Sequence, residues 1–315
     1  MVNTITPKVS IIIPTLNRSY LLKRSVESAF NQSYSNFEVI VSNNNSNDGT
    51  LLELSNLKER FGELIIVNHQ KRLSLSEHWD TVINKFSEGE YILLIPDDDI
   101  LIDPDYLCNA VGLFHKYKSV GLVFANYFIV NQDFVRVSEV SAGFDSFVSK
   151  DFLYANYNND LFGVKGVGVS HLTAIFSKKA YDGVNGFDLD CMCPDTYLWL
   201  KILLEYDAGF IREKVAEYLI HDSNLSDIGS VEYRYLDTKI IPEIENYSKK
   251  NNLYKVFMRD TFSRMSLIFY RRFYNVILKN ILNNREVVKS VRYFIKVNPY
   301  FFVLVVLKKF RSYVD

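Results

Sequence analysis

The alternation of short apolar runs with amphipathic stretches constrains the fold more than any other feature of this sequence. The apolar runs are predicted strands, and they cover residues 9–14, 37–42, 63–69 and 91–96. Each is followed by a stretch with helical spacing of apolar residues, the third of them at 75–86 with Ser76 as its expected N-cap. Strands that alternate with helices indicate a mostly parallel, doubly wound α/β sheet.

The regular alternation ends near residue 118. Residues 120–130 form one or two strands, and residues 194–206 form a helix with Pro194 in its first turn. From residue 231 onward the pattern is helical, with basic and aromatic residues interleaved. We therefore expect a catalytic domain over 1–230, with halves at about 1–118 and 119–230, and a basic helical extension over 231–315.

The charge is distributed unevenly along the chain. Residues 251–315 hold 13 Lys and Arg against 3 Asp and Glu, whereas residues 1–250 hold 23 against 34. Cations among Tyr, Phe, Val and Leu suit a helix that lies on an anionic membrane surface. The alternative is a helical appendage that packs on the catalytic domain or forms a homo-oligomer. No nucleic-acid-binding module accompanies the charge, so a nucleic-acid partner is not expected.

The cysteine content and the apolar runs bear on location. The three cysteines (Cys108, Cys191 and Cys193) are an odd number in a long chain and therefore do not indicate a disulfide framework, which favours a reducing, cytoplasmic compartment. The N-terminus lacks a signal-peptide pattern. No apolar run approaches the roughly 18 residues that span a bilayer. The expected location is the cytoplasm, with contact to the inner face of the cell membrane.

Three adjacent aspartates, Asp97, Asp98 and Asp99, follow the fourth predicted strand. In an open α/β sheet, ligands bind beyond the carboxyl ends of the strands, and this turn lies there with the polar loops that follow the other strands. Carboxylate oxygens are the ligands that Mg²⁺ and Mn²⁺ prefer. The alternative is a solvated turn whose aspartates favour the start of the next helix.

Several segments resemble family 2 glycosyltransferases, which have the GT-A fold. They are "VSIIIPTLNRSYLLKRSVESAFNQSYSNFEVIVSNNNSNDGT", "GEYILLIPDDDIL" and "GVNGFDLDCMCPDTYLWLKIL", in the order of the family pattern. The resemblance covers roughly residues 8–225 and is of the bacterial surface-polysaccharide type. It implies a Rossmann-like sheet flanked by helices, to which this chain adds the helical extension.

The resemblance implies a site for the donor nucleotide. The residues matched to it are Pro14, Thr15, Asn17, Arg18, Asn43, Asn44, Arg72 and Asp97. Asn43 and Asn44 stand where the family often has two aspartates, and an amide can donate as well as accept a hydrogen bond. A UDP-sugar is the first expectation, although this departure leaves uracil, thymine and guanine open.

The resemblance also implies a metal site for Mn²⁺ or Mg²⁺. The first acid of the family motif is replaced by Pro96, which makes Asp98 the expected ligand, with Asp99 and His221 as further candidates. Asp97 is expected at the ribose or at a metal-bound water. Asp99 is otherwise expected to support the turn or to contact sugar hydroxyls.

Asp195 matches the catalytic base of inverting members of the family. The neighbouring acids of that motif are replaced by Pro194 and Tyr197. Without the resemblance, an aspartate at this helix start would be taken to complement the helix dipole. The alternatives near it are Asp188 and Asp190, which with Trp199 are the expected acceptor contacts.

The expected function is therefore that of an inverting, metal-dependent glycosyltransferase. It would move a sugar from a nucleoside-diphosphate-sugar to a hydroxyl of a saccharide or lipid-linked acceptor in surface-polysaccharide synthesis. A nucleotidyltransferase is an alternative, but "PTLNRS" is not the Gly-rich loop expected of one. A catalytically inactive sugar-binding or scaffold protein is another, since Pro96, Asn43 and Asn44 depart from the family pattern.

Overall fold

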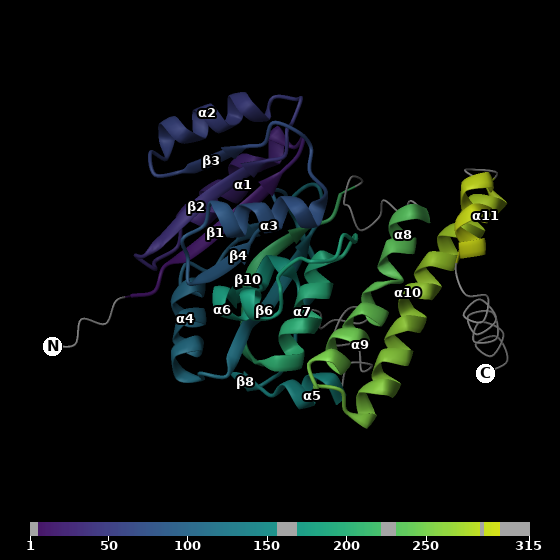
Figure 1. The fold of residues 1–315 in the computed structure, drawn as a ribbon. Coiled ribbons are helices and arrows are strands. Elements are labelled where there is room, and N and C mark those ends of the chain that lie inside the picture. Colours follow the sequence, from purple (N-terminus) through teal and green to yellow (C-terminus); the bar gives the residue numbers. More distant parts are fainter. Residues whose placement is uncertain (1–5, 156–168, 222–230, 284–286, 297–315) are drawn as a thin grey trace. The chain divides into compact units, whose positions relative to one another are not determined.

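The computed structural model of the chain describes residues 6–155, 169–221, 231–283 and 287–296 (Figure 1). The chain divides into two compact units, which are described separately. The first comprises Met1–Asp188 and Leu198–His221, and the second comprises Leu189–Tyr197 and Asp222–Asp315. The short segment Leu189–Tyr197 therefore belongs with the C-terminal helices and not with its neighbours in sequence.

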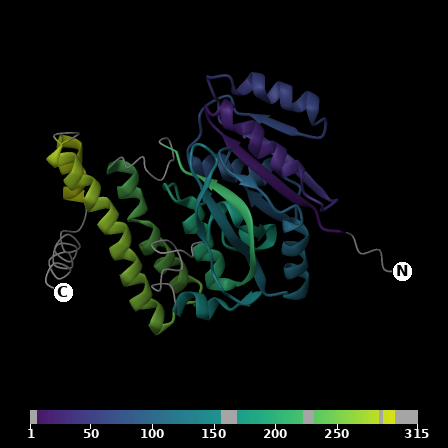
Figure 2. The same ribbon diagram turned by 180° about the vertical axis from the view of Figure 1, so that it is seen from behind.

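A ten-stranded sheet runs through the first unit (Figures 1 and 2). Its main path has the order β3-β2-β1-β4-β9-β6-β10-β5. The first four strands of this path pair in parallel and are β1 (Val9–Thr15), β2 (Phe37–Asn43), β3 (Ile65–Asn68) and β4 (Tyr91–Leu94). These four are the strands that the sequence predicts, and they end at the same edge of the sheet.

The remaining strands make the sheet mixed. The short strand β9 (Ile175–Ser177) lies antiparallel between β4 and β6 (Val120–Val130), which is a single strand. β10 (Asp207–Leu219) pairs in parallel with β6. Three short strands pair antiparallel with these: β5 (Ile100–Leu101), β7 (Arg136–Val140) and β8 (Phe147–Val148).

Helices follow the predicted strands at the predicted places. They are α1 (Ser19–Phe30), α2 (Thr50–Arg60), α3 (Leu75–Lys85) and α4 (Tyr106–Lys116). Further along the chain come α5 (Lys150–Ala155), the 3₁₀ turn η2 (His171–Thr173), α6 (Lys178–Gly183) and α7 (Pro194–Glu205). The prediction of Ser76 as the cap of the third helix is wrong, because Ser74 accepts the hydrogen bond from the Glu77 amide and Ser76 lies buried inside the helix.

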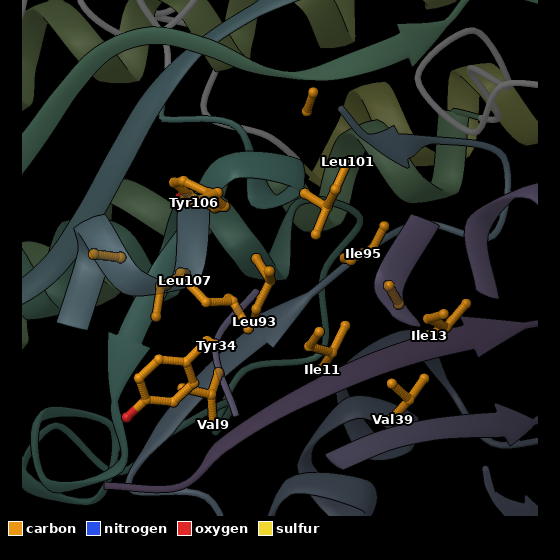
Figure 3. Packing of buried hydrophobic residues seen from close by; sticks show 14 of the residues in the cluster. Val9, Ile11, Ile13, Tyr34, Val39, Leu93, Ile95, Leu101, Tyr106 and Leu107 are labelled. Carbon is orange, nitrogen blue, oxygen red and sulfur yellow. The ribbon is translucent and has the colours of Figure 1, made fainter. Parts of the chain in front are cut away.

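Alternate residues of the strands build the main core of the first unit (Figure 3). In β1, Val9, Ile11 and Ile13 point into this core, where apolar residues of α1 and α4 meet them. Each fully buried aliphatic side chain of this kind stabilises the fold by about 1.5–3 kcal/mol relative to its exposed state. The polar carboxyl ends of the strands are therefore held in place by a continuous apolar layer.

The second unit contains α8 (Val231–Asp237), α9 (Ile240–Lys250), α10 (Val256–Leu282) and α11 (Val287–Lys296). Its core contains Val231 of α8 and three residues of α10 (Phe273, Tyr274 and Ile277), against which Tyr293 and Phe294 of α11 pack. Within the described residues, no helix is both long enough and apolar enough to span a membrane.

Candidate active site

The acidic turn lies at the carboxyl end of β4, beside the end of β1. All three aspartates are buried, with exposed fractions of 4% for Asp97, 7% for Asp98 and 1% for Asp99. Like charges can be buried side by side only if other groups compensate them. The alternative of a solvated turn is therefore not what the structure shows.

Asp97 and Asp98 share one cation. The Arg18 guanidinium donates from Nη1 to Asp97 Oδ1 at 3.1 Å and to Asp98 Oδ2 at 2.6 Å. Asp97 also accepts a hydrogen bond from Thr15 Oγ1 at 2.7 Å. Thr15 ends β1 and Arg18 precedes α1. The loop after β1 therefore supplies the positive charge that compensates the acidic turn after β4.

His221 reaches the same carboxylate from the far end of the chain. Its Nε2 lies 2.8 Å from Asp98 Oδ2, and both side chains are buried. The pairing of β10 with β5, which follows the acidic turn, brings Leu219 and His221 to this place. Asp99 Oδ1 accepts from the amide of Leu219, the last residue of β10, at 2.8 Å, so Leu219 and His221 contact two of the three aspartates.

Burial shifts the pKa values of Asp97 and Asp99. It raises the pKa of Asp97 to about 6, against the opposing effect of the Arg18 guanidinium. Burial and the adjacent Asp98 carboxylate raise the pKa of Asp99 well above its ordinary value. In both groups burial disfavours the ionised form, so a cation bound beside them would stabilise that form.

The loop after β1 is fastened to the loop after β2. Asn17 has a left-handed backbone with φ of 56°, a conformation that asparagine tolerates better than most residues. Its Oδ1 accepts from the Asn47 amide at 2.8 Å, and its own amide donates to Ser46 Oγ at 2.9 Å. This explains why an asparagine precedes Arg18, and it fixes the backbone that carries the guanidinium.

The two asparagines after β2 make hydrogen bonds within the protein. Asn44 Oδ1 accepts from the Leu73 amide at 2.8 Å, and its Nδ2 donates to the Leu73 carbonyl at 3.1 Å. Asn43 donates to Asn68 Oδ1 at 3.0 Å and accepts from the Ser46 amide. An aspartate could not make both bonds to Leu73, because it has no donor. Arg72 lies exposed on the loop that Asn44 holds, and the half-buried Pro14 pairs in the β1–β2 register with Ser42.

The side chains of the acidic turn can be compared with the ligands that a divalent metal ion needs. Within the described residues, no cluster of three or more His, Cys, Asp or Glu side chains could hold a metal ion. Two ligand atoms do converge, Asp98 Oδ2 and His221 Nε2, and Asp99 Oδ2 is buried without a hydrogen-bond partner. Two protein ligands fit a Mg²⁺ or Mn²⁺ ion whose other ligands are water and substrate phosphate.

The expected acceptor residues have different environments. In the first unit, Asp188 is half-exposed and accepts a hydrogen bond from the buried Lys201 Nζ at 2.5 Å. Trp199 is only 1% exposed and packs on Phe176 with ring centroids 5.4 Å apart. This burial does not favour contact between Trp199 and an acceptor.

The expected catalytic base belongs to the second unit. Asp195 is partly buried and lies in the first turn of α7, and Asp190 is exposed on the same segment. Since Pro194 begins the helix, the carboxylate of Asp195 stands next to the helix start, as the sequence predicts. Its role as a base stays a prediction.

Sequence reasoning missed a polar group behind the nucleotide loops. Ser42 Oγ lies 2.8 Å from His78 Nε2 and 3.0 Å from His69 Nε2. Burial and the neighbouring His69 lower the pKa of His78 to about 3, so the buried imidazole stays neutral. A histidine between Glu77 and Trp79 on a helical face was the only signal of this group, and its partner is 36 residues away.

The family model described as "Glycosyl transferase family 2" matches residues 10–183. The chain is 30% identical over 164 residues to the GalNAc(5)-diNAcBac-PP-undecaprenol beta-1,3-glucosyltransferase of Campylobacter jejuni, a match that covers 50% of this chain and 51% of that protein. It is 25% identical over 224 residues to the UDP-Glc:alpha-D-GlcNAc-diphosphoundecaprenol beta-1,3-glucosyltransferase WfgD of Escherichia coli, covering 69% of this chain and 79% of that protein. The chain thus aligns with about half the length of the first of these relatives.

Solved structures share the fold at low sequence identity. S. aureus TarS 1-349 in complex with UDP-GlcNAc superposes with a TM-score of 0.60 at 16% identity, covering 85% of this chain and 73% of that one. The mannosyltransferase PcManGT of Pyrobaculum calidifontis, in complex with GDP-Man and Mn²⁺, gives 0.59 at 16% identity, covering 97% and 87%. The expected GT-A fold with C-terminal helices is thereby confirmed, and from the family match and its relatives the chain belongs to glycosyltransferase family 2.

Proposed function

We propose that this chain is an inverting glycosyltransferase that moves a sugar from a nucleoside-diphosphate-sugar to a hydroxyl of a lipid-linked saccharide. One observation carries the proposal: the buried acidic turn is bonded to both Arg18 and His221 at the strand ends of a family 2 fold. The family match favours this reading over a nucleotidyltransferase.

The donor would occupy the strand ends beside the acidic turn. The Arg18 guanidinium lies 2.6 Å from Asp98, and in this proposal it would also bind the donor diphosphate. The loops that contain Asn17, Asn43 and Arg72 would surround the nucleoside. The E. coli relative is named for UDP-Glc, which makes a UDP-sugar the first donor to test.

A divalent cation would be held by Asp98 and His221, with Asp99 close behind them. When bound, it would supply positive charge to the leaving diphosphate. The metal in PcManGT is Mn²⁺, which makes Mn²⁺ the first ion to test and Mg²⁺ the second. Asp97 would keep Arg18 and Thr15 in place in either case.

Asp195 would accept the proton of the acceptor hydroxyl. As that oxygen attacks the anomeric carbon, the bond from this carbon to the diphosphate oxygen breaks, and its electron pair leaves with the diphosphate. A single displacement of this kind inverts the configuration. The structure supports the assignment by the position of Asp195 in the first turn of α7.

The acceptor is proposed from the relatives. Both curated relatives are named for acceptors carried on undecaprenol through a diphosphate. An enzyme that uses such an acceptor would work at the cytoplasmic face of the membrane. The basic helices of the second unit suit that surface, and a homo-oligomer through the same helices is the alternative.

The test is a panel of nucleotide sugars with Mn²⁺, an undecaprenyl-diphosphate-linked saccharide and purified full-length protein. We expect turnover of at least one donor, and a loss of kcat of about 100-fold or more in Asp98→Asn and in Asp195→Asn. Asp133→Asn removes an exposed carboxylate outside the proposed site and serves as the control. The transferase proposal fails if no donor is turned over and no nucleotide binds in the presence of metal.

A further inference from the structure

The second unit contains a buried carboxylate that the proposed reaction does not use. Asp237, the last residue of α8, is 1% exposed. Burial raises its pKa to about 6, against the opposing charge of Arg234. A buried carboxylate is costly unless it is bonded, so its partners show what the chain gains from it.

Two of those partners, Met192 and Cys193, lie on the segment that leads into α7, and the third, Arg234, lies on α8 itself. Asp237 Oδ1 accepts from the Met192 amide at 3.2 Å, and Oδ2 accepts from Arg234 Nη1 at 3.3 Å. The Cys193 thiol lies 3.9 Å from Oδ2. Asp237 therefore joins α8 to two consecutive residues of a segment more than 40 positions earlier in the chain.

Cys193 is also the residue immediately before α7, and Met192 precedes it. The Tyr197 amide donates to the Cys193 carbonyl at 3.1 Å, which is a hydrogen bond of the first helical turn. Pro194 opens the helix and Asp195 follows it. A bond at Met192 and a contact at Cys193 thus fix the backbone immediately before Asp195.

We propose that Asp237 is a positioning residue for Asp195, through which the C-terminal helical unit holds the catalytic base. This inference rests on the proposed function, in which Asp195 takes the proton of the acceptor. A base works only within hydrogen-bond reach of that proton, and a displacement of about 1 Å can cost about 100-fold in rate. The helical extension then contributes to catalysis itself, in addition to any role at a membrane.

The variant Asp237→Ala tests the proposal in full-length protein. We expect kcat to fall at least tenfold, while the donor KM and the Kd of UDP stay within twofold of the native values, because the proposed nucleotide residues lie in the first unit. Asp237→Asn should retain more activity than Asp237→Ala, because the amide oxygen can still accept from Met192. Thr238→Ala is the matched control: it removes a buried side-chain bond to the Tyr235 carbonyl at the same end of α8, without touching the Met192 segment.

Thiol labelling gives a local measurement that does not depend on activity. Cys108 is exposed and should react quickly with a thiol reagent in every variant, whereas the buried Cys191 should react slowly in native protein. Asp237→Ala should accelerate labelling of Cys191 at least fivefold, as measured by mass spectrometry of the labelled peptides. Thr238→Ala should leave that rate unchanged.

The inference is overturned if Asp237→Ala keeps kcat within twofold of native protein. It is equally overturned if Thr238→Ala lowers kcat as much, or if Asp237→Ala raises the donor KM in proportion, since either result indicates general damage to the fold. Should Asp237→Ala not fold, Asp237→Asn must show the same kcat-specific loss in smaller measure. Failure of the proposed function looks different: Asp195→Asn would then be fully active whatever Asp237 does.

Discussion

Asp98 Oδ2 accepts from Arg18 on one side and lies within hydrogen-bond distance of His221 on the other. Its neighbours Asp97 and Asp99 are bonded to Thr15 and to the Leu219 amide. Three identical residues in a row thus acquire three different environments. The difference comes from segments about 80 residues before them and 120 residues after them, and not from the turn itself.

Asn44 offers a prediction about the family's usual aspartate. In Asn44→Asp the Leu73 carbonyl loses its donor and faces a carboxylate, so the loop that carries Arg72 loses one of its two bonds to this side chain. We expect the Kd of UDP, measured by titration calorimetry, to rise about fivefold or more, corresponding to about 1 kcal/mol. Asn47→Asp adds the same charge at an exposed position of the same turn and should change the Kd less than twofold.

His78 gives a prediction about pH. Its folded pKa of about 3 lies below the ordinary 6.5, so at low pH the unfolded chain takes up a proton that the folded chain does not. Stability that is present above pH 6.5 is therefore lost as the pH falls toward 3, by up to about 1.4 kcal/mol per pH unit.

The test compares native protein with His78→Gln, whose amide can still bond to Ser42. Between pH 7 and pH 5 the native protein should lose about 2 kcal/mol more than the variant in urea unfolding. Other titrating groups, such as His69 beside it and Asp97, are common to both proteins and cancel in the difference. Equal pH dependence in the two proteins would contradict the assignment of a neutral, buried His78.

At the scale of elements, the turn between α6 and α7 is held by close packing. Gly186 has φ of +49°, and a Cβ there would lie 2.5 Å from the Tyr181 ring. The Gly186 carbonyl accepts from the buried Lys201 Nζ at 2.8 Å, and the Tyr181 hydroxyl donates to Asp80 of α3 at 2.5 Å. The turn therefore joins α3, α6 and α7.

Gly186→Ala should destabilise the first unit by about 3 kcal/mol, from the strained backbone and the clash with Tyr181. Tryptophan fluorescence during urea unfolding is a suitable measurement, because both tryptophans, Trp79 and Trp199, lie in this unit. Gly62→Ala is the control, since a Cβ there meets nothing within 4 Å, and it should change stability by less than about 0.5 kcal/mol. Similar losses in the two variants would contradict the packing argument.

The sequence predicts elements with strong periodicity and misses those without it. Continuous apolar runs identify β1, β2 and β4, and the helices between them follow from their spacing. The three-residue strand β9 has no such signal, because its place between β4 and β6 depends on tertiary pairing. Ser74 and Ser76 are equally good caps on composition, and only the backbone geometry decides between them.

The candidate site was predictable only in part, for a related reason. A motif locates residues along the chain, so Asp98, Arg18 and His221 could be nominated from their segments. It does not show that a single oxygen of Asp98 contacts both Arg18 and His221. Nor does it show that the Asn44 side chain donates one hydrogen bond to Leu73 and accepts another from it. The roles of Lys201 and Asp237 were not predicted, because only the folded chain brings Gly186 and Met192 next to them.

At the scale of the whole molecule, the basic C-terminal region gives a prediction about membranes. We expect full-length protein to sediment with vesicles that contain phosphatidylglycerol, and Arg292→Glu combined with Lys308→Glu and Lys309→Glu to weaken this binding at least tenfold. The control, Lys116→Glu with Lys118→Glu and Lys179→Glu, makes the same change in net charge on exposed positions of the first unit. Equal binding by both triple variants would remove the C-terminal region from the membrane contact.

The assignment of Leu189–Tyr197 to the C-terminal unit has a consequence for chimeric enzymes. A graft of another family member's C-terminal helices at residue 222 would follow the order of the sequence but would split Asp237 from Met192. The exchangeable module is discontinuous, since it consists of the helices together with a nine-residue insert from the middle of the chain. Chimeras of two relatives should therefore fold more often when the C-terminal helices and this insert come from the same parent protein.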